Sequence, residues 1–265
     1  MSSSAGTLVQ VSRASAADGV AIITLDDGAR GNACSFAMGE QLLVALEQLM
    51  YFDAGCRAIV LTGAGGVFCV GEELSDMQAL AVLDQRERSR LAVRVFELMA
   101  EGPKPLVAAV EGSAIGAGLA LAAVCDEVVG ARDARLGADF GRLGLLPDTG
   151  LYWSLAQRVG AGRARELLMT GREIDAEEAL RMGLATELVE PGGTLAAACV
   201  RARRYEAVPP LSVAHVRLAL ARHIGSLDDA IEAEADLQPM LRDSQDHKEA
   251  VAAFLGKRRP VFSGR

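Results

Sequence analysis

The chain has 265 residues, of which 51% are hydrophobic and 23% are charged, a globular balance that excludes a disordered, highly charged chain. The net charge of -8, from 27 basic and 35 acidic residues, argues against a nucleic-acid partner, because such partners usually meet a basic surface. Aromatic residues make up only 4%, and much of the apolar share is alanine, which favours close packing and many helices.

The cysteines and the apolar runs narrow the class of protein further. Five cysteines without a CxxC pair predict neither a disulfide framework nor a zinc site, and we expect no metal site. The segment Met1–Gly6 lacks the pattern of a secretory signal. The nearly apolar run Ala114–Cys125 contains glycines and is shorter than the ~20 residues that span a bilayer. We therefore expect a soluble, cytoplasmic protein with no membrane partner.

Strand and helix patterns alternate along most of the chain. In chain order, the hydrophobic spacing predicts strands at 7–11, 20–25, 57–62, 106–110, 127–131 and 184–189. It predicts helices at 35–52, 80–100, 119–124, 149–159, 163–170 and 175–183, with capping residues at Ser35 and Asp175. Such alternation favours an α/β fold with a mainly parallel sheet. The remainder is helical, so we divide the chain into a core at 1–200 and a C-terminal helical region at 201–265.

Two glycine-rich loops follow predicted strands and are candidates for a ligand site. They are Gly63–Leu74 and Glu111–Gly118. In open α/β sheets, ligands bind at the edge where strands end. Glycine lets a backbone N–H approach a ligand closely, and a helix start adds N–H groups without partners. One N–H from each loop could form an oxyanion hole. The alternative is that the glycines only make tight turns; neither GxGxxG nor GxxxxGK[ST] occurs, which disfavours nucleotide loops.

Three stretches together resemble the crotonase family, which is the enoyl-CoA hydratase/isomerase group. They are Phe68–Met77, Ala109–Gly118 and Leu143–Gly150, with supporting matches at Gly31–Ala33 and Glu249–Lys257. The resemblance covers about residues 8–263. It implies a crotonase-like spiral of repeated ββα units with a C-terminal helical region. It also implies an acyl-CoA substrate, with coenzyme A only as part of the thioester and no tightly bound cofactor, and homotrimers or hexamers built as dimers of trimers.

The resemblance also assigns site residues. The backbone N–H groups of Glu72 and Ala117 would hold the thioester oxygen, where an enolate concentrates charge and one fixed donor is worth ~3 kcal/mol. Because only backbone is used, the side chain of Glu72 must point away from the oxyanion or oppose its charge. The resemblance places coenzyme A beside a further set of residues, the last two of them reaching a neighbouring subunit's site: Ala33, Phe68, Val70, Gly71, Gly116, Phe254 and Lys257.

The chain departs from the hydratases of this family at two positions. Those enzymes activate water with two glutamates, and the matching positions here are Ala120 and Phe140, neither of which can transfer a proton. Asp139 lies one residue from the second position and would matter if the alignment slipped. Hydration by the usual pair is therefore not expected.

Asp148, within Leu-Pro-Asp-Thr-Gly, is the remaining candidate for proton transfer. It could cap the helix that starts near Thr149. Isomerases of the family instead place an aspartate in a similar Pro-Asp-x-Gly context, as does the ring-1,2-epoxyphenylacetyl-CoA isomerase group that this chain most resembles. Burial would raise the pKa of such an aspartate and make it a better base. Apolar walls for the acyl group could come from Phe140, Leu143, Leu146, Tyr152 and Trp153.

We therefore expect an isomerase that shifts a double bond, with Asp148 as a proton shuttle. Two alternatives stay open: a non-standard hydratase, hydrolase or dehalogenase of the same family, and an acyl-CoA-binding protein without turnover. All three histidines lie in the helical tail, which disfavours the dehalogenase because that enzyme uses a histidine near the substrate ring.

Overall fold

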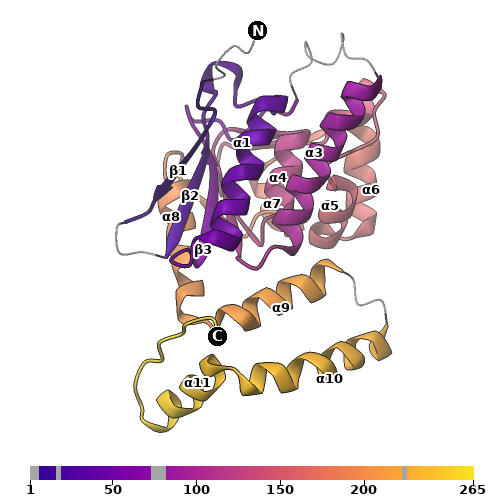
Figure 1. Cartoon of the computed structure of the whole chain (residues 1–265). Coiled ribbons are helices and arrows are strands. Elements are labelled where there is room, and N and C mark those ends of the chain that lie inside the picture. The colour runs from indigo at the N-terminus through magenta and orange to yellow at the C-terminus, as the bar shows by residue number, and fades with distance from the viewer. Residues whose placement is uncertain (1–5, 16–18, 73–81, 223–225) are drawn as a thin grey trace.

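A six-stranded sheet forms the centre of the molecule (Figure 1). The computed structural model describes residues 6–15, 19–72, 82–222 and 226–265. The sheet has the order β1 (Val9–Arg13), β2 (Val20–Leu25), β3 (Ala58–Gly63), β4 (Leu106–Val110), β6 (Glu127–Ala131) and β9 (Glu187–Val189). The β1–β2 pair is antiparallel and the other pairs are parallel. The predicted strands and the mainly parallel sheet are confirmed, with small shifts at the strand ends.

A second, three-stranded sheet gives the fold its repeat. It consists of β5 (Ser113–Ile115), β7 (Arg135–Gly137) and β8 (Glu173–Asp175). A strand of the central sheet is followed by a short strand of the second sheet and then by a helix, as in β4–β5–α4 and β6–β7–α5. The sequence analysis did not predict these short strands, because three residues are too few to show an alternating pattern.

Helices cover both faces of the central sheet (Figure 1). One face packs against α1 (Phe36–Glu47), α3 (Val82–Glu101), α4 (Ala117–Val124), α5 (Leu151–Val159), α6 (Ala161–Thr170) and α7 (Ala176–Met182). The other face packs against α8 (Thr194–Ala202). Along β4, Leu106, Ala108 and Val110 face the first set, whereas Val107 and Ala109 face α8. Burial on both sides explains why these strands are continuously apolar.

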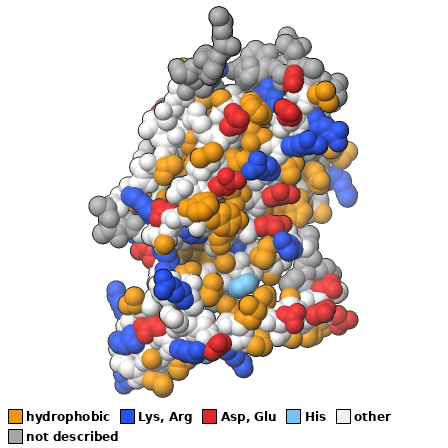
Figure 2. Space-filling model, viewed as in Figure 1, with side chains coloured by type: hydrophobic (Ala, Val, Ile, Leu, Met, Phe, Trp, Pro, Cys, Tyr) orange, Lys and Arg blue, Asp and Glu red, His pale blue; other side chains and the backbone are white. Residues whose placement is uncertain are grey.

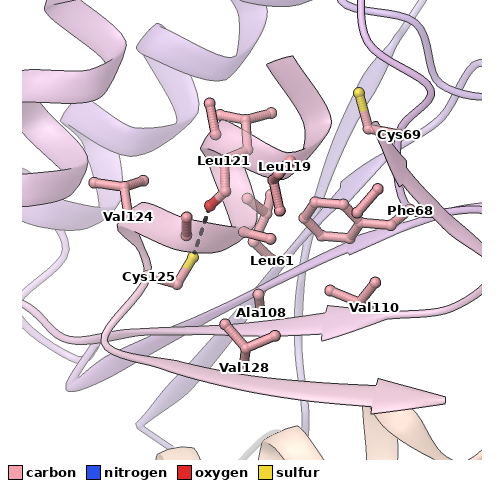
Figure 3. Close-up of a cluster of buried hydrophobic side chains, with 14 of the residues drawn as sticks. Leu61, Phe68, Cys69, Ala108, Val110, Leu119, Leu121, Val124, Cys125 and Val128 are labelled. Carbon is pink, nitrogen blue, oxygen red and sulfur yellow. Dashed lines mark hydrogen bonds between the residues drawn. The ribbon is translucent and has the colours of Figure 1, made fainter. Parts of the chain in front are cut away.

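The helix α4 lies in the middle of the core. All of its residues are buried, and Figure 3 shows Leu119 and Leu121 above Leu61 and Ala108 of the sheet. Its last turn is closed by Cys125, whose Sγ donates to the Leu121 carbonyl at 3.2 Å. Because α4 is apolar on every side, it is packed within the core on all sides. This packing holds the N-terminus of the helix, at Ala117, in a fixed position.

Two predicted helix caps are confirmed. Ser35 Oγ accepts from the Met38 N–H at 3.2 Å at the start of α1, and Asp175 Oδ1 accepts from the Glu178 N–H at 2.7 Å at the start of α7. The predicted helix at 35–52 continues beyond α1 as a π-helical turn, η2 (Gln48–Phe52). Three short 3₁₀ segments complete the helical elements of the described residues: η1 (Gly28–Arg30), η3 (Asp139–Leu143) and η4 (Arg203–Ala207).

The C-terminal helices α9 (Pro210–Ala221), α10 (Leu227–Asp243) and α11 (Gln245–Leu255) form a separate layer beside the core (Figure 1). The buried Arg217 of α9 ties this layer to the core, since it donates to the carbonyls of Gly102 and Met99 and pairs with Asp126 at 3.0 Å. The division at residue 200 stays a prediction. None of the helices among the described residues has the length and apolar character needed to cross a membrane.

Candidate active site

Two loops run side by side at the end of β3 and β4. The Phe68 N–H donates to the Glu111 carbonyl at 2.8 Å, and the Cys69 N–H donates to the Ser113 carbonyl at 2.9 Å. The Ile115 N–H returns a bond of 3.0 Å to the Cys69 carbonyl. This parallel pairing carries the first loop to Glu72 while the second reaches Ala117. The two predicted oxyanion positions therefore lie on adjacent loops.

Glycines allow the two loops to touch. A Cβ on Gly71, whose φ is 99°, would lie 3.0 Å from the Ile115 carbonyl oxygen and 3.8 Å from the Ala117 nitrogen. A Cβ on Gly118 would lie only 2.2 Å from the Cys69 carbonyl oxygen. No larger residue fits at Gly118 without moving backbone, and the positive φ of Gly71 also favours glycine. The interpretation that these glycines serve turns alone is thus incomplete, because they also set the distance between the loops.

The two N–H groups are available for a ligand. Ala117 is the first residue of α4, so its N–H has no acceptor within the helix and lies at the positive end of the helix dipole. Among the residues that the structure describes, neither the Glu72 nor the Ala117 N–H donates to another protein group. Two such donors on adjacent loops satisfy the first requirement of an oxyanion hole.

Two cavities meet at these loops, and Glu72 and Ala117 line both of them. The first has a volume of about 70 Å³ and lies between β2, α1, α3 and α4. Its walls are mainly apolar and include Leu25, Met38, Leu42, Leu91, Val95 and Leu121, with Cys34, Arg88 and Thr149 also contributing. The second has a volume of about 250 Å³ and is lined by Arg30, Ala33, Val70, Gly71, Gly116, Asp139, Phe140, Leu143 and Leu145.

The apolar walls differ from those that the sequence predicted. Phe140 and Leu143 line the larger cavity, but Leu146 and Tyr152 are exposed, and Trp153 packs against Phe96 with the rings 5.9 Å apart. The walls of the small cavity come from α1 and α3 instead. The helical spacing of the leucines in 35–52 indicated a buried face there, but nothing in the sequence says that the facing helix leaves a space.

Asp148 does not cap a helix, so that interpretation of its role is wrong. The residue before α5 is Gly150, and no side chain caps that helix. The Asp148 Oδ1 accepts instead from the Thr149 hydroxyl at 2.9 Å. Thr149 has a φ of 51°, a conformation that is strained for a β-branched residue. A Cβ on Gly150 would lie 2.2 Å from Phe96, so this turn packs tightly against α3.

The carboxyl groups of Asp148 and Glu72 are both partly buried and interact electrostatically. Burial raises the pKa of Asp148, and the hydrogen bond from Thr149 partly opposes this effect. Burial also raises the pKa of Glu72, the negative charge of Asp148 raises it further, and Arg88 opposes both. Clustered carboxyls with perturbed pKa values at a cavity are typical of functional sites.

Not every predicted coenzyme A residue lies at these cavities. Ala33, Val70, Gly71 and Gly116 line the larger one. Phe68 does not: its side chain is fully buried in the core (Figure 3), because it anchors the loop rather than facing the cavity. Sequence reasoning passed over Arg30 and Cys34, neither of which belongs to a recognisable charge or metal motif.

Phe254 and Lys257 lie at the end of α11 and do not reach either cavity of their own chain. Both are exposed, and Phe254 shows 83% of its surface. On the face of the helical layer that Figure 2 shows, exposed hydrophobic side chains lie among charged ones. Within a single chain, these two residues therefore form no part of the site.

A larger cleft of about 710 Å³ lies elsewhere, between α9 and the ends of α4 and α5. It is lined by Val124, Trp153 and Val216 among others, and not by Glu72 or Ala117. We place the candidate site at the smaller cavities, because Glu72 and Ala117, whose N–H groups have no acceptor among the described residues, line both of them, and Thr149, the hydrogen-bond donor to Asp148, lines one.

Comparisons with known proteins agree with this geometry. The family model described as enoyl-CoA hydratase/isomerase matches residues 15–265. The 1,2-epoxyphenylacetyl-CoA isomerase of Escherichia coli is 34% identical over 93% of this chain and 96% of that protein. A crystal structure of an enoyl-CoA hydratase from Bacillus anthracis superposes with a TM-score of 0.90 at 29% identity, covering 97% of this chain and 100% of that one.

The chain belongs to the enoyl-CoA hydratase/isomerase family and has the crotonase fold, so both expectations are confirmed. It is accordingly an enzyme of that family. The names of the relatives include both hydratases and an isomerase, so the type of reaction has to be argued from the site itself.

Proposed function

We propose that this protein is an acyl-CoA isomerase that shifts a double bond through a thioester enolate. The thioester oxygen binds the N–H groups of Glu72 and Ala117, and Asp148 moves a proton from one carbon to another. Coenzyme A takes part only as a portion of the substrate. The observation that carries the proposal is Asp148: a partly buried carboxyl, not used as a helix cap, that accepts from Thr149 of the small cavity and whose charge acts on Glu72.

The two cavities suit the two ends of such a substrate. The small apolar cavity between α1, α3 and α4 accepts the acyl group. The larger cavity, lined by Ala33 and Val70, accepts the start of the pantetheine chain, and Arg30 supplies a positive charge on that side. The thioester then lies between the cavities, where the two N–H groups meet. Stabilisation of the enolate by each donor is worth ~3 kcal/mol.

The residues at the usual glutamate positions favour isomerisation over hydration. Ala120 and Phe140 are both buried and hold no proton that could be exchanged. Isomerisation consumes no water, so one base can serve both proton transfers, and a positioned base of this kind contributes ~10²–10⁴-fold. The E. coli relative, named a 1,2-epoxyphenylacetyl-CoA isomerase, adds support and suggests a ring epoxide thioester as a second type of substrate.

We propose in addition that the active form is a homotrimer or a hexamer. Phe254 and Lys257 lie in the layer of C-terminal helices and line neither cavity of their own chain, whereas an adjoining copy could bring them to the coenzyme A end. Sedimentation of the full chain tests this, since a monomer at assay concentration would contradict it.

The Asp148→Asn variant tests the central assignment. It keeps the size of the side chain but removes the base, so turnover of a 3-enoyl-CoA should fall at least several hundred-fold, within the ~10²–10⁴-fold range for such groups. Binding of acyl-CoA should persist, because the N–H groups are unchanged. Asp133→Asn, at an exposed position, is the matched control. Turnover close to that of the unmodified protein would remove Asp148 from the mechanism.

A hydratase is the second candidate, because of Asp139. Its Oδ1 would lie 3.0 Å from a Cβ built on Gly116, so this carboxyl faces the oxyanion loop from the larger cavity. The absorbance of crotonyl-CoA follows hydration directly. Loss of that absorbance, abolished by Asp139→Asn and not by Asp148→Asn, would favour the hydratase. Tight binding of every ester tested without conversion would instead indicate an acyl-CoA-binding protein.

A further inference from the structure

The Glu72 side chain has no role in the proposed reaction, which uses only its N–H. Yet Glu72 lines both cavities, and the small one is shared with Arg88 and with Thr149, the neighbour and hydrogen-bond donor of Asp148. The sequence analysis expected this carboxylate to point away from the oxyanion, and that stays a prediction. Because Glu72 lines both cavities, it brings a second carboxyl-bearing residue to the place proposed for the thioester and acyl group.

We propose that the Glu72 side chain is a second catalytic group, a neutral carboxylic acid that protonates the substrate while Asp148 acts as the base. This inference rests on the proposed isomerase function and deepens it, since the single shuttle becomes a pair of residues. The two carboxyls approach the reacting carbons from different loops, Glu72 from the loop after β3 and Asp148 from the turn before α5. Each can therefore serve a different carbon of the enolate.

The charges around Glu72 support its neutral form. The small cavity presents Arg88 and the thiol of Cys34 to it, the turn before α5 adds Asp148, and the larger cavity presents Arg30 and Asp139. Two carboxylates in a shared, partly buried site resist ionising together. Burial raises the pKa of both carboxyls, and a charge on Asp148 raises the pKa of Glu72 further, so an ionised Asp148 favours the neutral form of Glu72. Paired acids in different environments take the roles of base and acid in this way.

The proton balance closes without a further reactant. The Asp148 carboxylate takes the proton from one carbon, and the electron pair of that C–H bond enters the conjugated enolate. The enolate then takes the Glu72 proton at the other carbon, which forms the new C–H bond and leaves Glu72 as a carboxylate. The proton on Asp148 passes back to Glu72, directly or through one water molecule, so that both groups return to their starting states. Because Glu72 is neutral when the enolate forms, it does not repel the developing charge.

The pH dependence of Glu72→Gln separates this mechanism from the single shuttle. In the unmodified enzyme, kcat should fall at low pH as Asp148 becomes protonated and at high pH as Glu72 loses its proton. Glu72→Gln keeps the backbone N–H and the side-chain size but removes the acid. We expect kcat for a 3-enoyl-CoA to fall by ~10²-fold, the alkaline limb to disappear, and the Kd for butyryl-CoA to stay within about threefold. Glu40→Gln, exposed on α1, is the charge-matched control and should leave all three quantities unchanged.

Other outcomes would overturn the proposal. They are an unmodified enzyme without an alkaline limb, a Glu72→Gln variant within about threefold of the unmodified kcat, and a loss confined to substrate binding. If Glu72→Gln does not fold, Glu72→Asp replaces it as the test. Its kcat should still fall at high pH, although at a different pH, because it keeps a carboxylic acid. A kcat that does not fall at high pH would contradict the role of Glu72 as an acid. Undiminished activity of Asp148→Asn marks the different failure, that of the proposed isomerase itself.

Discussion

The Sγ atoms of Cys34 and Cys69 lie 3.5 Å apart, and Cys69 belongs to the loop that carries Glu72. Cys34 also donates its N–H to the Gly71 carbonyl at 2.8 Å and lines the apolar cavity. The hydrogen bond to Cys69 and burial raise the pKa of Cys34, so this thiol is protonated at neutral pH. A thiol pair therefore connects the acyl cavity to the oxyanion loop.

Mild oxidation should join these two cysteines. Hydrogen peroxide would take two electrons and two protons from the thiols, giving one disulfide and two water molecules. The sulfurs must then approach to about 2.05 Å, which draws Cys34 and the attached Gly71 out of place. We expect a several-fold loss of turnover that a reducing agent reverses, with a disulfide-linked peptide pair in the mass spectrum. Cys34→Ser should resist the loss while Cys199→Ser should not; an oxidised enzyme of full activity would contradict this prediction.

Removing the charge of Asp148 should stabilise the protein at neutral pH. Burial raises the pKa of this carboxyl in the folded state. The folded state therefore binds its proton more tightly, and the resulting contribution to stability is present below the unfolded pKa and is lost as pH rises through the folded pKa. Asp148→Asn removes this loss, so its Tm should exceed that of the unmodified protein by about 1–3 °C at pH 7.

As the pH falls that difference should shrink, because the folded unmodified protein then binds a proton at Asp148 and no longer buries a charge there. Asp133→Asn, at an exposed site, should show no such pH-dependent gain. If Asp148→Asn were less stable than the unmodified protein at pH 7, this prediction would be wrong. That result would show that the contacts of the Asp148 carboxylate stabilise the folded state more than its burial destabilises it. The combination of higher stability and lost turnover is the usual mark of a site that is optimised for activity.

The parts of the fold that could be predicted are those with a periodic or buried signal. The residues of β4 are apolar throughout because both faces of the sheet are covered, and Ser35 marks a helix start through its own hydrogen bond. The three-residue strands β5, β7 and β8 carry no such signal. Spacing of the glycines indicated two loops that each follow a strand, and the resemblance to the crotonase family then assigned Glu72 and Ala117 within them.

What could not be predicted depends on contacts between distant segments. The turn at Asp148 resembles a helix start in sequence, and only its packing against Phe96 shifts the start of α5 to Leu151. Phe68 lies two residues before the lining residue Val70, yet its side chain is fully buried in the core. The approach of Glu72 to Asp148 joins loops about 75 residues apart, and no local pattern records it.

Gly71→Ala should lower kcat and change the Kd for acyl-CoA little, because the other cavity residues still bind the ligand. The added Cβ would lie 3.0 Å from the Ile115 carbonyl oxygen, at a φ of 99° that alanine rarely adopts. The loop must then retreat, which moves the Glu72 N–H away from the oxyanion. Loss of one such donor typically costs 10²–10³-fold in kcat.

Gly162→Ala is the matched control, since nothing lies within 4 Å of its added Cβ and the position is helical. That change should leave turnover intact and raise the unfolding free energy slightly, by up to about 1 kcal/mol. Unchanged turnover of Gly71→Ala, measured with the same 3-enoyl-CoA, would mean that the two loops do not form the oxyanion site.

Arg217→Leu should release the C-terminal helical layer from the core. Arg217 is buried, donates to the Met99 carbonyl at 2.6 Å, and pairs with the partly exposed Asp126, which also accepts from the Leu106 N–H at 2.7 Å. Leucine leaves the carbonyls of Met99 and Gly102 without this donor, and an unsatisfied buried acceptor typically costs about 1–3 kcal/mol of unfolding free energy. Urea denaturation measures the loss, and Arg217→Lys should not restore it, because an ammonium cannot form the forked contacts of a guanidinium.

Arg222→Leu, at an exposed pair with Glu101, should change the unfolding free energy by no more than about 0.5 kcal/mol. Equal effects at the two arginines would show that Arg217 does not hold the layer in place.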